Sequence, residues 1–153
     1  MKYKAKNTYT YKSFIKGYSY QSTQLDLSFD GTLTSYKGFV WDGCSPKFAI
    51  KLFGKSFYIG TPDFSFTYYA SRIHDLLYIH HKGINVKRIV IDYLFYLMIL
   101  DYGLREADQH ALQGSFNRFT IKYLFVHAIA AIYFTAVVLF GWLWWYRIVN
   151  IFR

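Results

Sequence analysis

The pattern of apolar and polar positions along the chain changes its period near residue 60. From Tyr9 to about Ile59, apolar and polar residues alternate over short runs, which is typical of half-buried strands. One run ends at Asp30-Gly31, a dipeptide that predicts a tight hairpin turn into the next run. A second hairpin is expected to turn at Gly54-Lys55. The β-rich part, about residues 1–60, is therefore predicted to form a small antiparallel sheet.

Beyond this part, apolar residues recur every three or four positions, which predicts helices. Asp63 is a candidate N-cap for a first helix over residues 64–81. A second helix is predicted over residues 86–102, and Gly103 is expected to end it. A third helix is expected to start near Arg105 and to continue into the last apolar stretch of the chain.

The C-terminal stretch from Tyr123 to Tyr146 contains 24 residues without a formal charge. As a helix it is about 36 Å long, enough to cross a hydrocarbon core of about 30 Å. Aromatic residues cluster at its end, and the basic residues Arg118, Lys122 and Arg147 flank it, as interfacial anchoring requires. The predicted fold class is α+β: a small antiparallel β-sheet, a helical half over about 63–120, and a C-terminal transmembrane helix. A soluble domain is expected over 1–120 and an anchor over 121–147.

The expected location is a membrane, with the chain tail-anchored by a single crossing. Residues 1–18 contain five Lys and no apolar segment of the kind that a signal peptide needs. Basic residues on the two sides of the span nearly balance, so they do not set the orientation. Because no export signal is recognised, the N-terminal domain is expected on the cytoplasmic side. Association with a virion is the other expected location.

Composition and charge narrow the class of partner. The chain has 153 residues, 23% of them aromatic, and a formal net charge of +9. A single cysteine, Cys44, excludes an intramolecular disulfide and a Cys-rich zinc site. Residues 1–60 hold nine Lys against three Asp, a net of +6, which suits anionic lipid. Nucleic acid is disfavoured, since no RNP, helix-turn-helix or zinc-finger pattern is present.

Three short segments carry polar groups that could do chemistry. A turn presents the Asp42 carboxylate and the Ser45 hydroxyl at the end of a predicted strand. His74-Asp75 lies near the middle of the first predicted helix. Asp92 lies in a helical run that is apolar nearly all round, so it is expected to be buried and to need a partner. Arg88, one turn earlier, is one candidate partner, and His74 or a metal ion is the other.

The three segments, in this order, resemble a phage and prophage family, domain-of-unknown-function family 1353. The matching elements are Asp42-Gly43-Cys44-Ser45-Pro46, His74-Asp75-Leu76-Leu77-Tyr78 and Arg88-Ile89-Val90-Ile91-Asp92-Tyr93-Leu94-Phe95, preceded by Gly38-Phe39. The resemblance covers about Gly38 to Phe125. The chain departs from the family at Cys44, where Ala is usual, and at Pro46, which directly follows Ser45. The resemblance implies a phage origin and a shared polar constellation, but no known reaction.

Two functions follow as expectations. The favoured one is a non-catalytic, membrane-anchored phage protein: a virion component, a lysis accessory or a component of the host envelope. Its partners are then the lipid bilayer and other phage or host membrane proteins. The alternative is a hydrolase at the membrane, dependent on a divalent metal ion or on a Ser/His pair. Its candidate catalytic residues are Asp42, Ser45, His74, Asp75 and Asp92, supported by Arg88 and Tyr78, with His74, Asp75 and Asp92 as candidate metal ligands. An open cleft would favour chemistry, and a sealed network would favour architecture.

Overall fold

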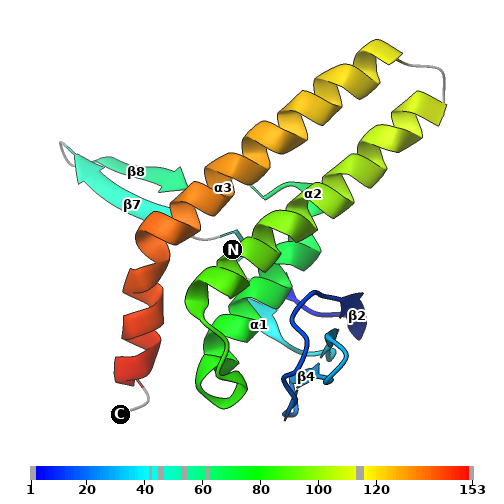
Figure 1. Cartoon of the computed structure of the whole chain (residues 1–153). Helices are drawn as coiled ribbons and strands as arrows, with labels where there is room; N and C mark the ends of the chain where they lie inside the picture. The colour runs from blue at the N-terminus through cyan, green and yellow to red at the C-terminus, as the bar shows by residue number, and fades with distance from the viewer. Residues whose placement is uncertain are drawn as a thin grey trace.

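The computed structural model describes residues 3–41, 43–44, 47–52, 55–60, 63–112 and 116–151. Within these ranges short strands come first and long helices follow (Figure 1), which confirms the predicted α+β class. The strands are β1 (Tyr3–Lys4), β2 (Tyr9–Lys12), β3 (Tyr20–Gln21), β4 (Leu25–Leu27), β5 (Thr32–Ser35), β6 (Val40–Trp41), β7 (Lys47–Leu52) and β8 (Lys55–Gly60). The helical elements are the 3-10 helix η1 (Ser65–Thr67), α1 (Tyr68–Ile84), α2 (Arg88–Leu112) and α3 (Phe116–Ile151).

The largest sheet is antiparallel and has the strand order β2-β5-β4-β3. The predicted hairpin at Asp30-Gly31 is confirmed, since Leu27 pairs with Leu33 across it. Gly31 has a φ of 88°, and a Cβ there would lie 2.6 Å from the Ser13 carbonyl oxygen, so only glycine fits this turn. Strands β1 and β6 form a separate antiparallel pair.

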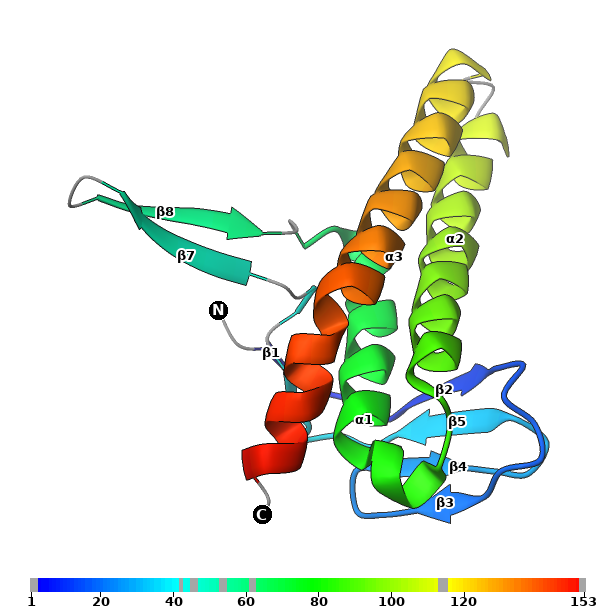
Figure 2. The same ribbon diagram turned by 60° about the vertical axis from the view of Figure 1, so that its left-hand side comes forward.

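The second hairpin, β7–β8, projects away from the helices in both views (Figure 1 and Figure 2). Its register pairs Leu52 with Lys55, so Lys55 belongs to β8. The prediction that the turn includes Lys55 was wrong by one position. The register of the two strands is set by their cross-strand pairing, and a turn dipeptide in the sequence locates it only to within a residue or so.

The start of the helical half also differs from the prediction. Asp63 does not cap a helix: its carboxylate accepts hydrogen bonds from the Cys44 backbone N–H (2.8 Å) and the Tyr3 hydroxyl (3.1 Å). The chain makes η1 first, and α1 begins only at Tyr68. Helix α1 ends at Ile84, and its C-cap residue Asn85 adopts the left-handed conformation with a φ of 58°. Asp63 therefore ties two N-terminal segments together instead of starting a helix.

The prediction that Gly103 ends the second helix was wrong. Helix α2 continues through this residue to Leu112. A Cβ at Gly103 would lie 2.4 Å from the Cγ1 atom of Val126 in α3. Gly103 therefore lies where two helices approach closely. Because glycine has no side chain, it suits a close helix contact as well as a helix end.

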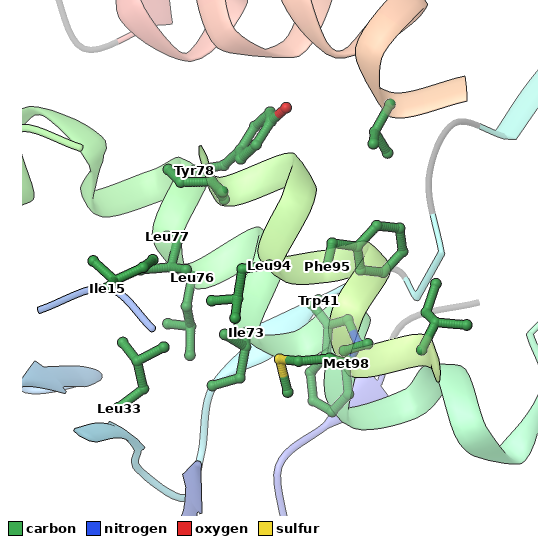
Figure 3. Packing of buried hydrophobic residues seen from close by; sticks show 14 of the residues in the cluster. Ile15, Leu33, Trp41, Ile73, Leu76, Leu77, Tyr78, Leu94, Phe95 and Met98 are labelled. Carbon is green, nitrogen blue, oxygen red and sulfur yellow. The ribbon is translucent and has the colours of Figure 1, made fainter. Parts of the chain in front are cut away.

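The core lies between the main sheet, α1 and α2, and α3 contributes to it. Figure 3 shows Leu33 of the sheet facing Ile73 and Leu76 of α1, and Leu94 and Met98 of α2 belong to the same cluster. Helix α3 runs back along α2 (Figure 2) and buries one face, formed by Val126, Ala130, Tyr133 and Val137. The boundary predicted at residue 120 stays a prediction, but α3 belongs to the same hydrophobic core as the preceding helices.

Candidate functional site

Asp92 lies at the centre of a polar network between the helices. No part of its side chain reaches solvent. Its Oδ1 atom lies 3.1 Å from His74 Nε2 and also accepts a hydrogen bond from the Tyr78 hydroxyl. His74 and Tyr78 are four residues apart, so α1 presents both on one face. The expectation that His74 and Asp92 meet across facing helices is confirmed.

Arg88 extends this network to α3. Its Nη1 atom lies 3.5 Å from Asp92 Oδ2, an ion pair one turn apart on α2. Arg88 also donates hydrogen bonds to the carbonyl oxygens of Val137 (3.1 Å) and Val138 (3.2 Å). Within the described residues, Asp92 Oδ2 has this ion pair but no hydrogen bond. The guanidinium is thus shared between a buried carboxylate and the backbone of another helix.

Helix α3 approaches the network at a glycine. A Cβ at Gly141 would lie 2.6 Å from the Tyr78 hydroxyl and 2.9 Å from Arg88 Nη1. Figure 3 shows the Tyr78 hydroxyl directed toward α3, away from the apolar core. Helix α3 bends where its colour turns from orange to red in Figure 1, and a side chain that competes for helix carbonyls is a known cause of bending. The network therefore joins α1, α2 and α3.

The second nitrogen of His74 faces a second carboxylate. His74 Nδ1 lies 3.6 Å from Asp75 Oδ1, and the two side chains expose 9% and 21% of their surface. Burial by itself lowers the pKa of His74, but hydrogen bonds to Asp75 and Asp92 and their negative charges outweigh it and raise the pKa above 6.5. Burial and the charge of Asp92 raise the pKa of Tyr78, so its hydroxyl stays a neutral donor.

This arrangement has two chemical readings. A carboxylate that binds one ring nitrogen of a histidine fixes the imidazole and prepares the other nitrogen to accept a proton. The same contacts also satisfy a buried charge and fasten three helices, which needs no chemistry. Asp92 itself is sealed from solvent, and the network reaches the surface at Asp75.

Two residues of the candidate turn, Asp42 and Ser45, lie outside the described residues, so their place at this site stays a prediction. The strand before it contacts α1 near the network. Trp41 Nε1 donates a hydrogen bond to Ser71 Oγ (3.2 Å), and Ser71 lies three residues before His74. The described part of the chain brings together His74, Tyr78, Asp92 and Arg88, with Asp75 beside His74.

The geometry of the described residues gives little support to the candidate metal site. Among the residues that the structure describes, no group of three or more His, Cys, Asp or Glu side chains is placed to hold a metal ion. His74 Nε2 is directed to Asp92, so these two predicted ligands contact each other. The metal-binding role of His74, Asp75 and Asp92 stays a prediction.

Arg72, which the sequence pattern did not single out, is a second cation near the network and, unlike Arg88, is almost fully buried. It donates hydrogen bonds to Ser35 Oγ (2.7 Å) and to the carbonyl oxygens of Ser35 (2.8 Å) and Tyr36 (3.0 Å), and thereby binds α1 to the main sheet. Its signal in the sequence is its position four residues before Leu76, on the apolar face of α1. A charge on an apolar face requires partners, and here the partners are a sheet backbone and a hydroxyl.

Comparisons of the chain with family models, with curated proteins and with solved structures find no match. The class of this protein is therefore defined only by its fold and by the buried network around Asp92. The described residues form an α+β protein with one long apolar helix, which is docked on the core through one face and tied to it by a buried ionic network.

Proposed function

We propose that the protein is a membrane-anchored component of non-catalytic role, attached to the bilayer by α3. The supporting observation is the surface of this helix. Its stretch from Arg118 to Trp142 has 25 residues. The most apolar window of that stretch has a mean hydropathy of 2.2, and only 22% of the window is buried. A soluble monomer rarely leaves so much contiguous apolar surface in water.

The non-catalytic role is supported by the sealing of Asp92. Its carboxylate contacts two side chains of α1 and a guanidinium that also binds α3, and it has no solvent exposure. A network of this kind fixes the relative positions of three helices. In this proposal the network holds α3 in place against the core, so that attachment to the membrane and folding are coupled.

The biological setting that we propose follows the resemblance to the phage family. The protein would act as a virion component, a lysis accessory or a component of the host envelope, with lipid and other phage or host membrane proteins as partners. A single crossing with the N-terminal domain on the cytoplasmic side is the form of attachment that the sequence predicts.

We expect the full chain, diluted from mild detergent, to float with lipid vesicles in a density gradient and to aggregate without lipid. The reason is the exposed apolar surface of α3. The measurement is the fraction of protein recovered with vesicles. A soluble, monomeric full chain that stays at the bottom of the gradient would contradict the proposed function.

A second candidate function, a hydrolase, is favoured by one observation: Asp92 binds His74 Nε2, while Nδ1 faces the partly exposed Asp75. In this candidate, His74 Nδ1 accepts a proton from a water molecule as the water oxygen attacks an ester carbonyl carbon. The proton then passes to the leaving alkoxide, and the products are a carboxylic acid and an alcohol. The network would then position the imidazole in addition to joining helices.

Stability and ester hydrolysis, both measured as a function of pH in the wild type and in His74→Gln, distinguish the non-catalytic protein from the hydrolase. Because its folded pKa lies above 6.5, the stability that its charge contributes is complete below about pH 6.5 and is lost as the pH rises through the folded pKa. His74→Gln is expected to remove this dependence of the unfolding free energy, whereas His80→Gln, on the same helix, is expected to keep it. A hydrolase would also cleave a chromogenic ester faster as His74 deprotonates. If the wild type and His74→Gln show the same background hydrolysis, the hydrolase is excluded.

A further inference from the structure

We propose that α3, in its docked position, lies along one leaflet of an anionic bilayer instead of crossing the membrane. This inference rests on the membrane attachment proposed above, and it replaces the single crossing that the sequence predicts with an in-plane geometry. It follows from the two faces of α3 and from the charges that α2 carries beside it.

The two faces of α3 have separate partners. One face, Val126, Ala130, Tyr133 and Val137, is buried against the core. The other face is apolar and exposed: Ile121, Ile132 and Leu139 expose 69%, 57% and 56% of their surface. Leu124, Phe125 and Trp142 belong to the same exposed stripe, at spacings of three and four residues from these. A helix with one face on protein and the opposite face apolar presents a long stripe to lipid.

Charged contacts between α2 and α3 oppose a crossing of the docked pair. Near the start of α3, Lys122 pairs with Glu106 of α2 at 2.9 Å. Farther along, Arg88 of α2 binds the Val138 carbonyl and pairs with Asp92. These two contacts are 16 residues apart on α3, about 24 Å along the helix, which is less than the hydrocarbon core of about 30 Å. A docked α3 that crossed the bilayer would therefore carry at least one of these ionic contacts into hydrocarbon, which is strongly unfavourable.

A crossing would thus require α3 to leave α2. That step would expose the buried face of α3 and would leave Arg88 without the α3 carbonyls. Lying in the plane of one leaflet avoids both costs, because the stripe enters the lipid while α2 and its charges remain on the aqueous side.

The residues at the two ends of the exposed stripe, together with the net charge of the chain, indicate that an anionic leaflet covers the stripe. Arg118 is exposed and precedes Ile121 by three residues, so it lies at one end of the stripe, where its head can reach lipid phosphates. Trp142 lies at the other end, at the position that aromatic residues prefer in the interface. The net charge of +9 adds attraction to anionic lipid.

The first arm of the test compares two added charges in the full chain. Ile132→Glu puts a carboxylate in the middle of the stripe, and Gln109→Glu puts the same charge at an exposed position of α2. We expect Ile132→Glu to weaken binding to phosphatidylglycerol-containing vesicles by at least about tenfold, and Gln109→Glu to change it by less than about twofold. Both variants should keep the unfolding temperature of the wild type, since neither side chain is in the core. Equal binding of the two variants would overturn the proposal.

The second arm locates the two ends of the chain. In a Cys44→Ser background, single cysteines replace Ser19 and Asn150, and the protein is added to preformed vesicles with a membrane-impermeant maleimide. We expect both cysteines to react before detergent is added. If Asn150→Cys reacts only after detergent, α3 crosses the bilayer; the in-plane geometry is then wrong while the proposed function stands. If the wild type does not bind vesicles at all, both are wrong.

A fluorophore attached to Ile132→Cys tests whether lipid covers the exposed stripe of α3. Its emission should shift to the blue only when vesicles are present, and the same fluorophore on Gln109→Cys should not respond. A probe at Ile132 that is already shielded in a dimer without lipid would show that a second copy of the chain covers the stripe, and would overturn the proposal.

Discussion

Replacing Asp92 with Ala is expected to lower the free energy of unfolding by about 3–5 kcal/mol, the range for breaking a buried ion pair by removing one partner. The substitution leaves His74, Tyr78 and Arg88 without the carboxylate that each contacts. Arg88 would keep its hydrogen bonds to α3 but would be a half-buried cation without its anion. Asp92→Asn keeps the shape and an acceptor for Tyr78, so we expect a smaller loss of about 1–3 kcal/mol.

Asp101→Ala is the matched control. Asp101 lies on the same helix and also pairs with an arginine one turn away, since Arg105 Nε lies 3.0 Å from Asp101 Oδ1, but this pair is exposed. An exposed pair of this kind contributes less than about 1 kcal/mol. The three variants are compared by chemical and thermal unfolding in one detergent. Equal losses for Asp92→Ala and Asp101→Ala would refute the view that the Asp92 network holds the helices together.

Ending the chain at Leu112 is expected to prevent cooperative folding of the remainder. This deletion removes α3, and with it Val126, Ala130, Tyr133 and Val137 from the core. At about 1.5–3 kcal/mol for each large apolar side chain, the loss is on the order of 5 kcal/mol or more, comparable with the whole stability of a small domain. The expected result is a chain without a sharp thermal transition, measured by circular dichroism.

A chain that ends at Arg147 is the control for this deletion. It keeps the four buried residues and Trp145, whose ring centroid lies 3.9 Å from that of His81 and 5.2 Å from that of Tyr78. We expect it to fold and to bind vesicles. A cooperatively folded, soluble chain ending at Leu112 would instead show that α3 is an independent anchor. For the same reason, failure of a truncated chain to bind membranes does not by itself identify α3 as the anchor.

Local sequence patterns predicted the elements whose formation depends on near neighbours. Alternation on both sides of Asp30-Gly31 predicted the β4–β5 hairpin, because a period of two and a turn dipeptide are properties of the segment itself. The contact between Asp92 and His74 was also predictable, since a carboxylate in an apolar helix must have a partner and few polar groups are available. The candidate residues Asp42 and Ser45 lie outside the described residues, so their part of the site stays a prediction.

The sequence by itself determined the α+β order, the apolar C-terminal helix and the need of Asp92 for partners. Only the tertiary structure decided which partners were used. Gly103 is compatible with a helix end and with a close helix contact, and the approach of Val126 selected the second. Asp63 could cap a helix, but Cys44 and Tyr3 bind its carboxylate. Helix α3 could stand apart as an anchor, but one face docks on the core. The reason is the same in each case: a local pattern specifies which groups must be satisfied or buried, whereas the group that satisfies them lies far away in the sequence.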